Sequence, residues 1–263
     1  MRGFASLALA TALQFTLCSL CVRAQTQDTP PAGGISDSGA GRTTDLSTFV
    51  PHTLEDQKQA FIKFPSEVVH GKHLVPVLAV LGATAGLVAA DQYDARWFRQ
   101  NTYNGTFNSV FSSAGTATGI VLTPAVFYSA GLLSGDDYAK HTGLLTAEAA
   151  IDGEIVDFAL KLISDRRRPV TIRTSDNYSD SFFEGANHVS GSFPSGHTVA
   201  AFAVATVVAR RYGHSHRWVP PLAYGLAAAV GFSRITGSAH FPSDVFFGGA
   251  VGYSIARFAV LRQ

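Results

Sequence analysis

Six runs of mostly apolar residues follow one another along the chain, separated by polar turns. They span residues 74–90, 116–133, 143–163, 198–211, 219–232 and 244–260. Each run is long enough for several helical turns, and glycine and other turn residues punctuate the intervals between them. The pattern therefore predicts six helices.

The third run differs from the first two, which contain no charged residue. Its charged members are Glu148, Asp152, Glu154, Asp157 and Lys161, and such groups are costly to expose to lipid. Asp157 and Lys161 stand four residues apart and can form an ion pair on the helix surface. That pair either holds Lys161 in a working rotamer or is an ordinary surface pair.

Two further segments show weaker patterns outside the six runs. Residues 54–64 mix apolar and charged positions, which indicates a short surface helix against the main body. Residues 93–111 look amphipathic. For Asp91, Asp94, Arg96 and Arg99 we expect a solvated face.

The N-terminal residues have the pattern of a secretory signal peptide: a basic residue, an apolar stretch over residues 4–22, and Ala24 at the expected cleavage site. We therefore expect residues 1–24 to be removed and the protein to be exported, to the periplasm or outside the cell. Cys18 and Cys21 both lie in that segment, so the exported chain would have no disulfide. A lipoprotein anchor is disfavoured, because leucine precedes each cysteine where a small residue is needed.

The amino-acid composition indicates how the rest of the chain is divided into a linker and a domain. Residues 25–53 are rich in Pro, Gly, Ser and Thr and predict a disordered linker. Residues 54–263 then form one domain, since 46% of the 263 residues are hydrophobic and only 15% are charged. The net charge of +1 gives no support for a nucleic-acid partner. His70 and His73 lack a third ligand nearby, so we expect no metal site there, and His214 and His216 read as a solvated turn.

Three short motifs carry the candidate chemistry. They read Lys161-x6-Arg168-Pro169, Pro194-Ser195-Gly196-His197 and Ser233-Arg234-x5-His240-x3-Asp244. Lysine and arginine side chains bind phosphate oxygens, histidine can act as a nucleophile or proton carrier near neutral pH, and a neighbouring carboxylate can orient it. The second motif precedes an apolar run, and the N-terminus of a helix binds anions.

Together and in this order, the motifs resemble the signature of the type 2 phosphatidic acid phosphatase and vanadium haloperoxidase superfamily. The resemblance covers residues 141–260 and matches every signature position. It implies an all-α fold, a six-helix core bundle with the active site at one end. It also implies phosphatase activity without a metal or other cofactor, on phosphate monoesters or pyrophosphates, lipid phosphates such as phosphatidic acid or undecaprenyl pyrophosphate among them.

The resemblance also assigns roles to individual residues. His240 would be the nucleophile that becomes phosphohistidine, Asp244 would fix its tautomer, and His197 would be the general acid. Ser195, Gly196 and the three cations Lys161, Arg168 and Arg234 would hold the phosphoryl oxygens. The polar loop over residues 171–192 is expected to form the rim of the pocket; His188 in that loop is a weak candidate, and Arg166 and Arg167 are interpreted as solvated.

Two alternative functions use the same residues: a haloperoxidase holding vanadate in the anion cage, and a phosphate-binding module without activity. An intact His240, His197 and Asp244 set argues against the second, which would need only the cations. Location also has two readings. The charges of the third run and the short apolar run after His197 favour a soluble or peripherally membrane-bound domain over a six-span protein. The sequence does not indicate an oligomeric state.

Overall fold

The computed structural model describes residues 45–102, 105–111, 113–173, 176–178, 180–184 and 191–261. Within these ranges the chain forms helices and no strands, which confirms the all-α class. The expected signal peptide, most of the expected linker and His188 lie outside the described residues.

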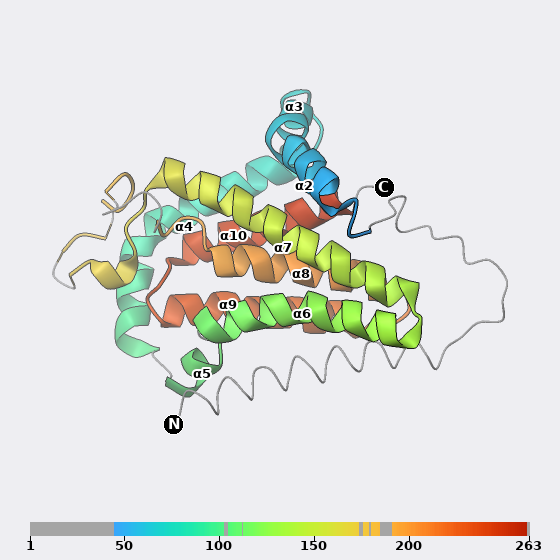
Figure 1. The fold of residues 1–263 in the computed structure, drawn as a ribbon. Coiled ribbons are helices and arrows are strands. Elements are labelled where there is room, and N and C mark those ends of the chain that lie inside the picture. Colours follow the sequence, from blue (N-terminus) through green and yellow to red (C-terminus); the bar gives the residue numbers. More distant parts are fainter. Residues whose placement is uncertain are drawn as a thin grey trace.

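All six predicted helices are present (Figure 1). They are α4 (Leu74–Asn101), α6 (Ser113–Ser134), α7 (Asp137–Ser164), α8 (Gly196–Tyr212), α9 (Val219–Thr236) and α10 (Pro242–Ile255), the last continued by η3 (Ala256–Val260). The segment after residue 93 is divided: α4 continues to Asn101, and a short helix, α5 (Gly105–Val110), follows. The change from a charge-free to an amphipathic pattern therefore falls inside one helix.

The N-terminal part of the described chain packs on the outside of the bundle (Figure 1). It consists of α2 (Phe49–Lys58), η1 (Gln59–Lys63) and α3 (Phe64–Val69), so the helix begins before the expected boundary at residue 54. Gln57 Nε2 donates to Asp152 Oδ1 of α7 over 2.9 Å. The expected short helix against the main body is thus present, and it covers a polar part of α7.

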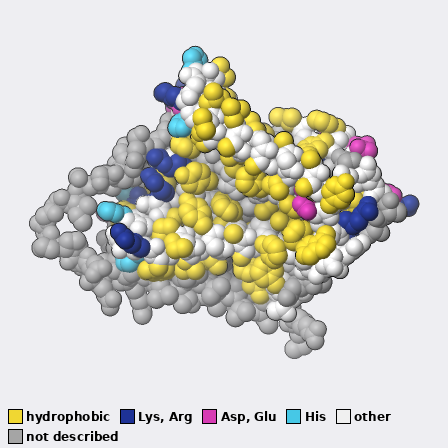
Figure 2. Space-filling model, turned by 180° about the vertical axis from the view of Figure 1, so that it is seen from behind, with side chains coloured by type: hydrophobic (Ala, Val, Ile, Leu, Met, Phe, Trp, Pro, Cys, Tyr) yellow, Lys and Arg dark blue, Asp and Glu magenta, His cyan; other side chains and the backbone are white. Residues whose placement is uncertain are grey.

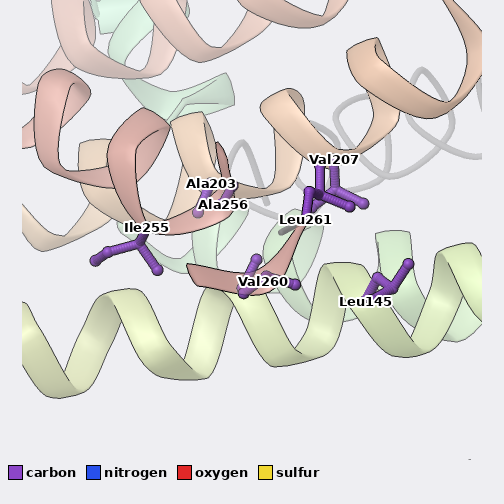
Figure 3. Packing of buried hydrophobic residues seen from close by; sticks show 8 residues of the cluster. Leu145, Ala203, Val207, Ile255, Ala256, Val260 and Leu261 are labelled. Atoms are coloured by element: carbon purple, nitrogen blue, oxygen red, sulfur yellow. The ribbon is translucent and has the colours of Figure 1, made fainter. Parts of the chain in front are cut away.

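Helix α8 lies at the centre and packs against α7, α9 and α10. The main core cluster joins Leu145 of α7 and Val207 of α8 to Ile255 and Val260 at the end of the chain (Figure 3). Helices α8 and α10 approach so closely that a Cβ atom on Gly252 would lie 2.1 Å from the carbonyl oxygen of Val199. Glycine is therefore required at this crossing.

Three of the five charged residues named above for α7 are enclosed by the protein, whereas Glu154 is exposed. Glu148, Asp152 and Asp157 are all buried, whereas the exposed residues of the same helix include Ile151 and Phe158. The cost of exposing this helix to lipid is therefore smaller than the sequence implied, because the protein itself encloses three of the five charges.

Within the described part of the chain, two helices are long and apolar enough to cross a membrane, α4 and α6. Only 11% of the apolar window of α4 and 22% of that of α6 is buried inside the protein. Figure 2 shows hydrophobic side chains over most of one face of the molecule, with most lysines and arginines toward its edges. Both observations are consistent with membrane association.

The solvated face predicted for the C-terminal half of α4 is present only in part, since Arg96 is exposed and Asp94 partly exposed. Asp91 is buried, and Arg99 Nη1 donates to the carbonyl oxygens of Pro169 and Ile172, at 3.2 and 2.8 Å. The reason is tertiary: the polar segment after α7 folds back across α4, so these side chains meet backbone and charged groups there.

Candidate active site

The three motifs meet at one end of the bundle. Lys161 and Arg234 lie near the C-terminal ends of α7 and α9, while Gly196 and Asp244 lie in the first turns of α8 and α10. The backbone amide of Ser195 donates to the carbonyl oxygen of Asp244 over 3.1 Å. This bond joins the starts of α8 and α10 and brings the second and third motifs together.

Lys161 is held by a buried ion pair. Its Nζ atom lies 2.5 Å from Asp157 Oδ2, and Asp157 is almost fully enclosed. The predicted pair therefore exists, but it is an interior pair and not one on the helix surface. Gly196 packs beside it, since a Cβ atom there would lie 2.7 Å from Asp157 Oδ2 and 3.1 Å from Lys161 Nζ.

The start of α8 supplies the second part of the site. Ser195 is the N-cap residue and is fully buried, and Gly196 is the first helical residue. Free backbone amides at a helix N-terminus attract anions. His197 follows immediately, with its Nε2 atom 3.4 Å from the carbonyl oxygen of Ser113.

Arg234 points back toward the segment between α5 and α6. Its Nη1 donates to Ser113 Oγ over 2.9 Å, and its Nη2 donates to the carbonyl oxygen of Phe111. Its Nε donates to Ser233 Oγ over 3.1 Å. The planar guanidinium is thereby fixed in orientation beside His197, whose pKa responds to its charge.

His240 is buried and oriented by a backbone carbonyl. Its Nδ1 lies 2.7 Å from the carbonyl oxygen of Ser192 and 3.7 Å from Asp244 Oδ2. Asp244 Oδ2 in turn accepts from Ser192 Oγ over 2.5 Å and from the amide of Phe241 over 2.8 Å. Ser192 therefore bridges the histidine and the carboxylate.

Arg166, interpreted from the sequence as solvated, is also part of this end of the bundle. Only 1% of it is exposed, and its Nη1 and Nη2 donate to Asp244 Oδ1 and Asp91 Oδ2, at 2.6 and 2.8 Å. The interpretation was wrong because a run of three arginines gives no sign that its first member turns inward while Arg167 stays partly exposed. Helix α7 ends at Asp165, whose φ of 36° is left-handed, and the chain changes direction there.

Charges within the cluster act on one another. Burial is the largest cause that lowers the pKa of His197, to about 4, and the charges of Arg234 and His240 act in the same direction. Burial also lowers the pKa of His240, against the opposing effect of Asp244. Both imidazoles are therefore neutral near pH 7 in the empty site.

The arrangement places positive charge, helix amides and two histidines around one point. Arg168 belongs to this group, since its charge acts on the pKa of both His240 and Arg234. Such a cluster can bind a tetrahedral oxyanion and attack it with an imidazole nitrogen. Sequence reasoning found the motif residues but not Asp91, Arg166 or Ser192; the spacing of the motifs gives no signal for them.

The remaining candidates contribute nothing visible to this cluster. His73 stacks with the rings of Phe64 and Phe258. Across the described ranges, no three His, Cys, Asp or Glu side chains group closely enough to hold a metal ion.

Comparison with known proteins identifies the domain that carries the site. Residues 142–263 match the PAP2 superfamily. This segment is a PAP2 superfamily domain. All eight motif residues predicted to act in the site lie inside it, whereas Asp91 in α4 precedes it.

The comparisons also gave one curated protein and one solved structure that are similar to parts of this chain. The lipid A 1-phosphatase of Porphyromonas gingivalis is 44% identical over 66 residues, which are 25% of this chain and 15% of that protein. The crystal structure of the first transmembrane PAP2 type phosphatidylglycerolphosphate phosphatase from Bacillus subtilis covers 69% of this chain and 92% of its own, with 20% identity and a TM-score of 0.46. The chain thus spans only a small part of the length of the curated relative.

Proposed function

We propose that this PAP2 protein is a membrane-associated phosphatase that removes a phosphate group from a lipid phosphate monoester or diphosphate through a phosphohistidine on His240. One observation carries the proposal above the others. The Nδ1 atom of His240 faces a backbone carbonyl at 2.7 Å, and a carbonyl oxygen only accepts hydrogen bonds. The proton therefore sits on Nδ1, and Nε2 keeps the lone pair that an attack on phosphorus needs.

The cations and the start of α8 would bind the phosphoryl group. Lys161, Arg168 and Arg234 would neutralise its oxygens, and the buried Ser195 and the amide of Gly196 would complete the contact. Phosphoryl transfer depends mainly on such positioning and charge stabilisation. Arg234 now donates to Ser113 and Phe111, so substrate binding would replace those acceptors with phosphoryl oxygens.

The first chemical step would form the phosphoenzyme. Nε2 of His240 attacks phosphorus, a nitrogen–phosphorus bond forms, and the bond from phosphorus to the leaving oxygen breaks. Protonated His197 gives its proton to that oxygen, so the product leaves as an alcohol or a phosphate. The low pKa of His197 in the empty site makes it a strong acid once protonated.

The second step would reverse these roles. His197, now neutral, accepts a proton from water while the water oxygen attacks phosphorus. The bond between phosphorus and His240 breaks, and inorganic phosphate is released. No step uses a metal ion or another cofactor, because the charge is supplied by lysine and arginine side chains.

Two observations support a lipid as the substrate. Helices α4 and α6 leave most of their apolar surface exposed, which would place the site near a membrane. The relative from Porphyromonas gingivalis carries the name lipid A 1-phosphatase and shares 44% identity over its matched segment. Export through residues 1–24, and a periplasmic or extracellular site, remain part of the same proposal.

The test is a substrate panel with the full chain in detergent. We expect release of inorganic phosphate from phosphatidic acid, phosphatidylglycerolphosphate, lipid A or an isoprenyl diphosphate, faster than from soluble sugar phosphates. Activity should survive EDTA and fall with vanadate. Halide oxidation in the presence of vanadate, without any phosphate release, would instead favour the haloperoxidase reading; tight phosphate binding without turnover would favour a binding module.

A further inference from the structure

Arg166 is a buried guanidinium shared between two carboxylates. Besides its bonds to Asp244 and Asp91, its Nε donates to Ser181 Oγ over 3.0 Å and its Nη1 to Ser243 Oγ over 2.8 Å. Aromatic rings of Phe182 and Phe241 lie 4.3 and 3.9 Å from its Cζ atom. A side chain fixed by so many contacts has one orientation.

Asp91 connects this guanidinium to the first turn of α10. Its Oδ2 accepts from Ser243 Oγ, and its Oδ1 lies 3.3 Å from the amide of Ser243. A carboxylate at a helix N-terminus is favoured by the exposed amides and the helix dipole. Asp91 thus fixes the turn that carries Asp244, although it comes from α4 and lies far from it in sequence.

The same arginine also supports the backbone that orients His240. The carbonyl oxygen of Arg166 accepts from the amide of Ser192 over 2.7 Å. Ser192 then presents its own carbonyl to His240 Nδ1 and its hydroxyl to Asp244. Both contacts that hold the imidazole therefore depend on Arg166.

The charges in this group do not cancel. With both carboxylates ionised, one guanidinium between Asp91 and Asp244 leaves a net charge of about −1. Without Asp91 the pair would be neutral, and Asp244 would stabilise a positive imidazole less. The other titratable groups that act on His240 are Asp157 from α7, Arg168 from the segment after it and His197 from α8.

We propose that Asp91 is a positioning residue for the nucleophile: through Arg166 it holds Asp244 and Ser192 against His240 and leaves Asp244 its negative charge. The predicted effect on turnover rests on the proposed function. The predicted effect on the pKa of His240 does not depend on it. It assigns α4, which precedes the PAP2 domain, a part in the reaction.

The first test compares turnover of variants on one helix. We expect Asp91→Asn to lower kcat and the single-turnover rate of phosphoenzyme formation by about 10-fold to 100-fold, with KM little changed. Asp91→Glu should recover part of the loss. Asp94→Asn, one helical turn away, is the matched control and should stay near the wild-type rate.

The second test does not need phosphatase activity. Diethylpyrocarbonate modifies neutral imidazoles, and the tryptic peptide of residues 235–257 contains His240 as its only histidine. Removing the charge of Asp91 should lower the pKa of His240, so the pH midpoint of its modification should move to lower pH in Asp91→Asn. The midpoint in Asp94→Asn should stay at the wild-type value.

The outcomes separate the two proposals. A shifted midpoint in a protein without phosphatase activity would keep the assignment of Asp91 and reject the proposed function. If Asp91→Asn matches the wild type in both kcat and midpoint, or if Asp94→Asn shows equal losses, the inference about Asp91 fails. Should Asp91→Asn fold poorly by thermal unfolding, Ser243→Ala removes the bridging hydroxyl and should show a smaller effect in the same direction; no effect there would also overturn it.

Discussion

The carbonyl oxygen of Ser192 lies closer to Nδ1 of His240 than any carboxylate does, at 2.7 Å. The tautomer of the proposed nucleophile is thus set by the backbone, and Asp244, 3.7 Å from the same nitrogen, acts on it mainly through its charge and through Ser192. Because a side-chain substitution does not remove a backbone carbonyl, the direct experiment is to substitute His240 itself.

His240→Ala should abolish turnover, since the covalent route needs the imidazole nitrogen. The fold should persist, which circular dichroism can check. His197→Ala is the informative partner: with a good leaving group such as p-nitrophenol it should still form the phosphoenzyme, but hydrolyse it slowly. Acid-quenched His197→Ala protein that never carries labelled phosphate would show that His197 has been assigned the wrong role.

The leaving group should determine the pH dependence. Since the pKa of His197 is about 4, the protonated acid becomes rarer by about tenfold per pH unit above pH 5. Burial lowers the pKa of His240 as well, which favours the form with a free lone pair. We expect the ratio of kcat/KM for an alkyl phosphate to that for p-nitrophenyl phosphate to rise as pH falls from 7 to 5. A ratio independent of pH would contradict this assignment.

Each of the three cationic side chains Lys161, Arg168 and Arg234 should be required for full turnover. Lys161→Met or Arg234→Lys should lower kcat by about 100-fold or more, by analogy with removing one donor from an oxyanion hole. Arg168→Lys should also be impaired, because an ammonium does not reproduce the bidentate fork. The inhibition constant for vanadate should weaken in parallel; unchanged vanadate inhibition would place these side chains outside the anion site.

The protein should behave as a membrane protein in fractionation. The exposed apolar surfaces of α4 and α6 and the inward charges of α7 predict that it resists alkaline carbonate and high salt and is released by detergent. Quantitative release by carbonate would restore the soluble or peripheral reading.

Two glycines offer a matched test of the helix crossing. Gly252→Ala would place a Cβ atom 2.1 Å from the carbonyl oxygen of Val199, and it should destabilise the fold by about 1–3 kcal/mol or more. Gly225→Ala meets no atom within 4 Å and should stabilise α9 by about 0.5–1 kcal/mol. Thermal unfolding in detergent measures both; equal effects would mean that α8 and α10 do not cross this closely.

Local pattern alone determined the helices and the motif residues. Apolar runs between turn residues predicted six helices because each run can bury or face apolar surroundings along several turns, and all six are present. Lys161, His197 and His240 were named as candidate site residues because their motifs resemble those of a known family, and the structure brings the three motifs to one end of the bundle.

What the tertiary structure decided is where the charges go. The sequence places Asp91 and Arg166 among other charged residues and predicts water around both, yet 1% of each is exposed and they form an ion pair. Glu148, Asp152 and Asp157 of α7 are likewise buried, while Ile151 and Phe158 of the same helix are exposed. The sequence pattern shows that a helix has a polar and an apolar side. Which side packs against the protein depends on residues distant in sequence, because burying a charge is favourable only where an opposite charge and hydrogen-bond partners are present.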